Sequence, residues 1–147
     1  MQKAKKYSGF SLIEILIVVG LILILAAITI VAINPAKHFR DTRNSQRSAD
    51  VSEILNAVSQ FTGEEGMTLA DLGTIPLCED GVTPASIGTS GVDLSASLVD
   101  EFIVEIPKDP TNGTDADTGY TICQTDGGRV EITAPRAEET DPIVVKR

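Results

Sequence analysis

The sequence predicts an α+β protein with a long N-terminal helix and a small β-rich C-terminal part. Two observations lead to this prediction. An uncharged aliphatic run lies near the N-terminus, and two β-rich stretches near the C-terminus are separated by a glycine-containing turn. The chain has 147 residues, which allows one domain or at most two.

The aliphatic run covers nineteen residues, from Ile15 to Ile33. As a helix rising about 1.5 Å per residue it would be roughly 28 Å long, close to the hydrocarbon thickness of a bilayer. The run is apolar on every side, and a domain of this size could not bury such a helix. A single membrane-spanning segment is therefore predicted.

Charge is distributed unevenly around this segment. Residues 1–50 hold seven Lys and Arg against three Asp and Glu, a net charge of +4, whereas the remainder holds five against eighteen, a net charge of −13. The basic start, with Lys3, Lys5 and Lys6, favours a cytoplasmic N-terminus and an exported C-terminal part, although four basic residues also follow the run (Lys37, Arg40, Arg43 and Arg47). The acidic body argues against direct binding of nucleic acid, because DNA affinity comes largely from Lys and Arg on phosphates.

A carboxylate, Glu14, stands directly before the aliphatic run. A charge at this depth costs about 2–3 kcal/mol on insertion scales unless it finds a partner. An ordinary membrane anchor gains nothing from such a residue. We therefore expect Glu14 to pair with a positive group.

The segment around Glu14 resembles the class III signal of type IV pilins and type II secretion pseudopilins. The matching residues are Lys5-Lys6-Tyr7-Ser8-Gly9-Phe10-Ser11-Leu12-Ile13-Glu14, followed by the aliphatic run. In that family prepilin peptidase cuts after the Gly, the next residue is N-methylated, and the Glu neutralises the N-terminus of a neighbouring subunit. The resemblance implies cleavage between Gly9 and Phe10, N-methylation of Phe10 and an assembly role for Glu14.

Cleavage at this bond also has a physical rationale. It would leave an ammonium on Phe10 and a carboxylate on Glu14 at the same end of an apolar helix. In a low-dielectric environment the two charges are strongly favoured as a pair, and pairing between subunits would set an axial register. The segment that first dissolves in membrane lipid could then pack against identical segments in a helical filament.

The predicted organisation follows from these features and from the helix signals after the run. Asn34-Pro35 is typical of a helix start, an apolar stripe with helical spacing follows (Val51, Ile54, Leu55, Val58 and Phe61), and Gly63 ends it. The resemblance implies that a small antiparallel sheet covers this stripe. The mid-span Pro usual in type IV pilins is absent. We expect a leader (1–9), a transmembrane and assembly helix (10–34), an amphipathic helix (35–62) and an exported β-rich domain (63–147).

Several pieces of the C-terminal part can be predicted individually. Residues 119–125 and 129–133 are predicted to form a hairpin around Asp126-Gly127-Gly128, and residues 143–145 a terminal strand. Residues 93–99 are typical of a short capped helix. Pro107-Lys108-Asp109-Pro110 followed by Tyr120 is similar to a pattern found in many pilins and pseudopilins.

Cys78 and Cys123 are the only cysteines in the sequence. An exported domain with two cysteines is a setting in which a disulfide is expected, worth about 2–4 kcal/mol. The alternative is a pair of buried free thiols. No CxxC spacing is present, so a zinc or redox site is not expected.

One acidic stretch is a weak candidate for calcium. Its oxygen-bearing residues are Asp109, Asn112, Asp115 and Asp117. Some pseudopilins bind calcium in a nearby loop, but the spacing is not that of an EF-hand. We expect a solvated loop and no cofactor, with calcium as the alternative.

Catalysis is not expected, because His38 is the only histidine and no Ser-His or Cys-His arrangement can form in the exported part. The resemblance implies a type IV pilus subunit for adhesion, motility or DNA uptake. It would be processed by prepilin peptidase, assembled by inner-membrane machinery, and located first in the inner membrane and then in an extracellular or periplasmic filament. The first alternative is a pseudopilin of a type II secretion or competence system, and the second is a membrane-anchored binding domain.

Overall fold

The computed structural model of the chain describes residues 9–79 and 81–147. It consists of two compact units, up to Phe39 and from Arg40 onward. The predicted leader falls on residues 1–8 and on Gly9, so its residues Lys3, Lys5, Lys6 and Ser8 lie outside the described part.

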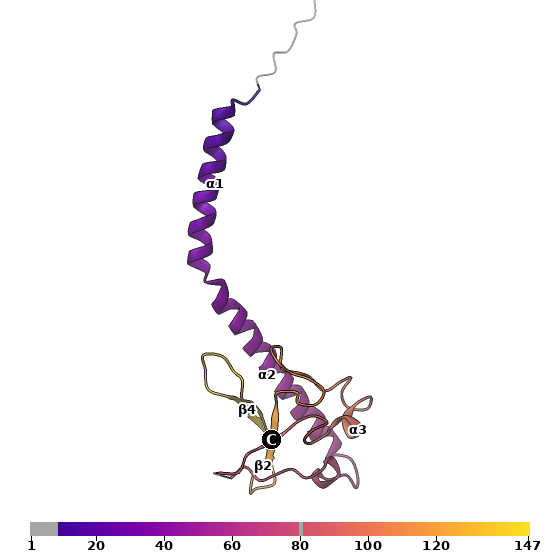
Figure 1. Ribbon diagram of the computed structural model, residues 1–147. Coiled ribbons are helices and arrows are strands. Elements are labelled where there is room, and N and C mark those ends of the chain that lie inside the picture. Colours follow the sequence, from indigo (N-terminus) through magenta and orange to yellow (C-terminus); the bar gives the residue numbers. More distant parts are fainter. Residues whose placement is uncertain (1–8, 80) are drawn as a thin grey trace, which may run out of the picture. The chain divides into compact units, whose positions relative to one another are not determined.

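The first unit is built from one long helix and the start of a second. Helix α1 covers Leu12–Ile33, and α2 begins at Pro35 (Figure 1). Asn34 between them adopts a left-handed conformation with φ 47°, and its carbonyl accepts a hydrogen bond from the Lys37 amide at 3.1 Å. Pro35 has no amide hydrogen to continue the ladder of α1. The predicted helix start at Asn34-Pro35 is therefore confirmed.

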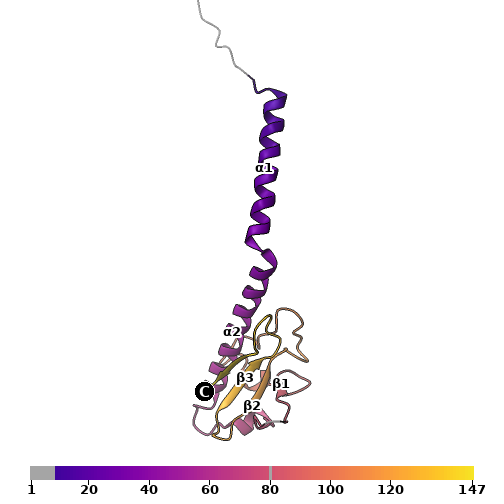
Figure 2. The same cartoon turned by 90° about the vertical axis from the view of Figure 1, so that its left-hand side faces the viewer.

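The second unit combines the remainder of α2, which ends at Phe61, with an antiparallel sheet. Within the described residues the sheet has four strands in the order β1-β2-β3-β4: Ala85–Ser86, Thr121–Gln124, Val130–Ala134 and Ile143–Lys146. Strands β2 and β3 pair with Ile122 opposite Ile132, as expected for the predicted hairpin. Figure 2 shows the sheet beside α2. The prediction of an α+β fold is confirmed.

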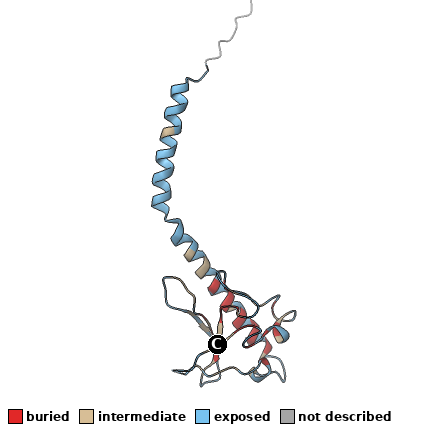
Figure 3. Cartoon of the chain, viewed as in Figure 1, coloured by how far each residue is buried: buried red, intermediate tan, exposed pale blue. Residues whose placement is uncertain are grey.

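The core of the second unit lies between α2 and the sheet. Helix α2 contributes the predicted stripe, and the sheet contributes every second residue of β3, so that Val130, Ile132 and Ala134 are buried. Figure 3 shows this change along the chain: α1 has no buried residue, whereas buried residues alternate with exposed ones in the second half of α2. Val51, Ile54 and Ile132 are each 0% exposed. Burial of this kind contributes about 1.5–3 kcal/mol per aliphatic side chain.

Short elements and loops close the rest of this unit. A 3-10 turn, η1, covers Leu69–Leu72, and the helix predicted over residues 93–99 is reduced to α3, Ser95–Leu98. Leu94 is the N-cap of this short helix and makes no side-chain cap hydrogen bond; the carboxylate of Asp93, one residue earlier, accepts hydrogen bonds from the amide and hydroxyl of Ser95. Leu98 is fully buried and fixes α3 against the core.

Candidate processing and assembly segment

The predicted cleavage site lies in an accessible stretch before α1. Gly9 and Phe10 are exposed, with the Phe10 side chain 79% exposed, and Ser11 has an extended backbone. The first helical hydrogen bonds run from the amides of Glu14 and Ile15 to the carbonyl of Ser11. The bond between Gly9 and Phe10 therefore lies outside the helical ladder, where a peptidase can approach it.

Glu14 lies in the first turn of α1. The N-terminus of a helix carries a partial positive charge, which favours a carboxylate by about 0.3–1 kcal/mol where the site is exposed. That gain is smaller than the cost of placing a carboxylate at the start of a membrane span. The helix terminus alone therefore does not compensate this cost, and Glu14 needs a stronger positive partner.

Helix α1 has the surface expected of a segment that packs outside its own chain. An 18-residue stretch of this helix has a mean hydropathy of 3.3, and none of the 22 residues of α1 is buried. Gly20 is the one residue of α1 that is partly covered. An apolar cylinder of this length is suited either to lipid or to copies of itself.

The comparison with protein families decides what this segment is. Residues 4–30 match the model of the prokaryotic N-terminal methylation motif. The N-terminal segment is a type IV pilin-like prepilin signal. The fold behind the signal, a long apolar helix followed by a second helix and a four-stranded antiparallel sheet, is consistent with type IV pilins. No curated protein and no solved structure gives a significant match to this chain.

The prepilin signal, together with a helix long and apolar enough to cross a membrane, indicates a membrane-anchored precursor that is pilin-like or pseudopilin-like. Such precursors are structural proteins. Processing by prepilin peptidase and assembly into a pilus-type filament are implied by the motif.

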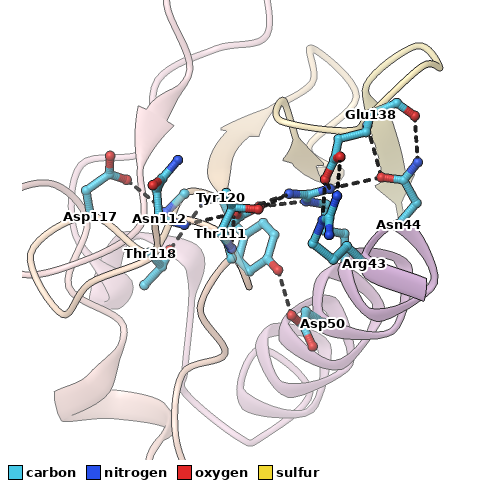
Figure 4. A network of polar contacts seen from close by, with 12 residues as sticks. Arg43, Asn44, Asp50, Thr111, Asn112, Asp117, Thr118, Tyr120 and Glu138 are labelled. Atoms are coloured by element: carbon cyan, nitrogen blue, oxygen red, sulfur yellow. Dashed lines mark hydrogen bonds and ion pairs between the residues drawn. The ribbon is translucent and has the colours of Figure 1, made fainter. Parts of the chain in front are cut away.

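In the second unit, the head of the protein, a buried arginine of α2 binds the loop that carries Asp109. Arg47 is 1% exposed, and its Nε donates to Oδ2 of Asp109 at 2.6 Å. Its two terminal nitrogens donate to Asp109, Thr111, Asn44 and Glu138, so that all five N–H groups of the guanidinium have acceptors. Figure 4 shows this network. A buried charge is tolerated only when its hydrogen bonds are complete in this way.

The carboxylate of Asp109 also accepts hydrogen bonds from its own loop. Burial raises the pKa of its carboxyl, but the hydrogen bonds from Arg47 and from the amides of Thr111 and Asn112 outweigh burial, so the pKa lies below its ordinary value. The hydrogen bond to Asp109 in turn raises the pKa of Arg47. Both groups therefore stay charged, and the loop that carries Asp109 is fixed on α2.

Glu138, in the loop between β3 and β4, joins the same network. Its carboxylate accepts hydrogen bonds from Arg43 at 2.6 and 2.5 Å and from Arg47 at 3.1 Å. Its backbone exchanges two hydrogen bonds with the side-chain amide of Asn44. The hydrogen bonds from Arg43 are the main cause that lowers the pKa of Glu138 to about 2. The start of the second unit is thus clasped by a loop some 90 residues later in the chain.

A second polar contact with α2 comes from Tyr120. Its hydroxyl donates to Oδ2 of Asp50 at 2.6 Å, and the tyrosine is completely buried. Burial raises the pKa of Asp50, and burial together with the hydrogen bond to Asp50 raises the pKa of Tyr120. The neighbouring Gly119 has φ 85°, and a Cβ there would lie 2.7 Å from Cβ of Asp109. Glycine is therefore required where the two anchored residues approach each other.

These contacts explain the pattern of Pro107-Lys108-Asp109-Pro110 followed by Tyr120. Asp109 binds Arg47 and Tyr120 binds Asp50, and the two partners lie three residues apart on the same helix. The sequence motif includes Asp109 and Tyr120, but the local charge pattern places Arg47 in the basic flank of the membrane segment and does not indicate its burial. The signal for that burial is the helical spacing of Arg47 and Asp50 with the apolar stripe that follows them, which places both residues on the side that faces the core.

Cys78 and Cys123 form a disulfide. It attaches the long segment after η1 to strand β2, next to the hydrogen bond from the Cys78 amide to the Gln124 carbonyl. Glu131 lies close to both sulfurs, but cysteines joined in a disulfide offer no thiolate to a metal.

The residues considered for calcium each have another partner. Asp109 binds Arg47, Asp115 pairs with Lys108 at 2.6 Å, and Asp117 accepts a hydrogen bond from the Ser86 hydroxyl at 2.6 Å and lies 3.3 Å from Arg136. The amide of Asn112 donates to Asp109. Among the described residues these carboxylates serve to hold loops together.

Proposed function

We propose that this protein is a subunit of a type IV pilus-like filament. Prepilin peptidase would cut between Gly9 and Phe10, Phe10 would be N-methylated, and Glu14 would neutralise the new N-terminus of a neighbouring subunit. The observation that carries the proposal is the conjunction of a methylation motif with an apolar helix of which no residue is buried. Adhesion, motility or DNA uptake would be the role of the assembled filament.

The proposed route begins in the inner membrane. The basic N-terminus would remain in the cytoplasm, α1 would span the bilayer, and the acidic second unit would be exported. After cleavage the inner-membrane assembly machinery would move α1 from lipid into a bundle of identical helices. Contact with lipid and contact with other copies use the same apolar surface, so one segment can serve both stages.

The disulfide supports the exported location of the second unit. Disulfides persist in oxidising compartments and are rare in the cytosol. The second unit also carries the buried ion pair and the sheet that stabilise it without any contribution from the residues of α1 to its hydrophobic core. Such a head can be displayed on a filament while α1 forms the filament interior.

Mass spectrometry of the N-terminal peptide tests the proposal. Filaments sheared from cells and the remaining membranes are compared, and the expected chain begins at N-methyl-Phe10 and is abundant in the sheared fraction. The same terminus confined to membranes would favour the pseudopilin alternative. An intact N-terminus in both fractions would contradict processing and leave an ordinary anchored domain.

Gly9→Val provides the matched control. A Cβ at Gly9 would meet no atom within 4 Å, so the substitution changes recognition of the bond without straining the described structure. The variant is expected to accumulate uncleaved in membranes with the disulfide formed normally. Normal cleavage of Gly9→Val would contradict the assignment of Gly9 to the processing site.

A further inference from the structure

The first turn of α2 exposes residues that neither the core nor the processing segment uses. Lys37, His38 and Phe39 are all exposed, and the Phe39 ring is 65% exposed. Among the described residues that follow α1, Phe39 is the one aromatic side chain with a large exposed surface. It belongs to the first unit together with α1.

The length of α1 fixes the level at which this turn would lie in a membrane. Its 22 residues span about 33 Å, slightly more than the hydrocarbon core of a bilayer. The break at Asn34 and Pro35 therefore falls where hydrocarbon gives way to headgroups. Lys37 and Phe39 follow within about one helical turn, at the depth where aromatic rings and lysine ammonium groups are favoured.

The basic residues beyond α1 differ in their partners. Three of them are arginines paired with carboxylates of the second unit: Arg40 with Glu139 at 2.9 Å, Arg43 with Glu138 at 2.5 Å and Arg47 with Asp109 at 2.6 Å. Lys37 has no ion pair within the described residues. The folded head thus neutralises the arginines and leaves the lysine nearest the membrane available to an outside anion.

We propose that Lys37 and Phe39 form an interfacial anchor for anionic phospholipid in the leaflet next to the exported head. The ring of Phe39 would lie at the level of the upper acyl chains, and the ammonium of Lys37 would bind a headgroup phosphate. The inference rests on the proposed function, because it requires α1 to span the bilayer. The anchor would hold the subunit at a fixed depth until it is extracted into a filament.

The positions of the two residues favour lipid over a protein partner. Residues two apart on an α-helix point about 200° away from each other, so Lys37 and Phe39 lie on opposite sides of α2. A single protein surface would cover one of them. Lipid surrounds the helix on all sides and can engage both.

The sequence contains no tryptophan, which allows a single reporter to be introduced. Phe39→Trp is placed in the full chain and reconstituted in vesicles of phosphatidylcholine and phosphatidylglycerol. Bromine on an acyl chain quenches tryptophan fluorescence on contact. In one set of vesicles the phosphatidylcholine is brominated, and in a second set the phosphatidylglycerol is brominated, at equal mole fraction. We expect quenching in both cases, and stronger quenching when phosphatidylglycerol carries the bromine.

Two further reporters separate this inference from the proposed function. Leu21→Trp, in the middle of α1, is expected to be quenched and tests membrane insertion itself. Val104→Trp, at a side chain of the head that is 88% exposed, is expected to remain in water. A quenched Leu21→Trp with an unquenched Phe39→Trp would overturn the anchor and leave the proposed function intact. An unquenched Leu21→Trp would contradict insertion and thereby the proposed function.

Lys37→Gln in the Phe39→Trp background tests the phosphate contact. The preference for brominated phosphatidylglycerol is expected to disappear, while quenching by the neutral lipid persists. Lys108→Gln, on the head, is the matched control and is expected to retain the preference. A preference that survives Lys37→Gln would overturn the role of Lys37. A Phe39→Trp reporter that is exposed to water in vesicles but shielded in filaments would overturn the lipid assignment in favour of a contact between subunits.

Discussion

Helix α1 and the second half of α2 are both rich in aliphatic residues, yet only α2 buries its aliphatic residues within the chain. No residue of α1 is buried, whereas eight residues of α2 are buried, including Arg47 and Asp50. In α2 the apolar residues occupy one side of the helix. Arg47 and Asp50 precede them on that side and bind Asp109 and Tyr120 of the second unit. In α1 the apolar residues occupy every side and find no cover within the described part of the chain. The first pattern stabilises a fold, and the second provides a surface for lipid or for other subunits.

The comparison predicts that changes in the two regions have separable consequences. Substitutions in the polar network of the second unit should reduce its stability and leave membrane insertion and processing of the N-terminus intact. Substitutions at the start of α1 should impair assembly and leave the stability of the head intact.

Arg47→Met should cause the largest loss of stability. It leaves the carboxylate of Asp109 buried without its cation, which typically costs about 3–5 kcal/mol. Urea unfolding of the second unit measures the loss. Arg43→Met, at a partly exposed ion pair, is the matched control and should cause a much smaller loss. Equal losses in the two variants would contradict the special role of the buried pair.

The double substitution Cys78→Ala and Cys123→Ala should have the next largest effect. Removing the disulfide restores freedom to the unfolded chain and is expected to cost about 2–4 kcal/mol. Thermal unfolding with and without a thiol reductant checks this value. The reductant should destabilise the natural chain and have no effect on the double variant. A reductant effect of equal size in both proteins would contradict the stabilising role of the disulfide.

Tyr120→Phe should destabilise the head by a smaller amount. The substitution removes the hydroxyl that donates to the buried carboxylate of Asp50, and an unsatisfied group of this kind costs about 1–3 kcal/mol. Tyr7→Phe, a change of the same chemistry in the leader of the unprocessed chain, is the control. Unchanged urea unfolding of Tyr120→Phe would show that this hydrogen bond adds nothing to stability.

Acid should weaken the clasp formed by Glu138. Its folded-state pKa of about 2 lies below the ordinary value, so the unfolded chain binds more protons in the interval between the two, and stability falls as pH decreases through that interval. Glu138→Gln and Arg43→Gln should each flatten the acid limb of a stability-against-pH curve. An acid limb that is unchanged in both variants would contradict the contribution of this pair.

Much of this architecture could be predicted from local sequence patterns. The uncharged run predicted α1, the spacing of Val51, Ile54 and Val58 predicted the buried side of α2, and Asp126-Gly127-Gly128 predicted the turn between β2 and β3. Each of these signals depends on residues close together in the chain. They are reliable because backbone geometry alone places such residues on one side of an element.

The polar network could not be predicted in this way. Arg47 lies 62 residues from Asp109 and 91 from Glu138, and a single sequence does not show which distant charges meet. An arginine among Ser and Asp residues is more typical of a solvated helix side than of a core. For the same reason the sequence places Asp109 among nearby oxygen-bearing residues as a weak calcium candidate, whereas its carboxylate accepts a hydrogen bond from Arg47 of α2.

The central claim is that the exposed start of α1 mediates contact between subunits through Glu14. Filament yield from Glu14→Gln tests it most directly, with the N-terminal mass confirming that processing is normal and Glu64→Gln, in an exposed loop of the head, as the matched control. We expect Glu14→Gln to give a cleaved, membrane-inserted subunit with a stable head and few or no filaments, while Glu64→Gln gives the normal amount. A normal filament yield from Glu14→Gln would contradict the charge pair on which the proposed assembly depends.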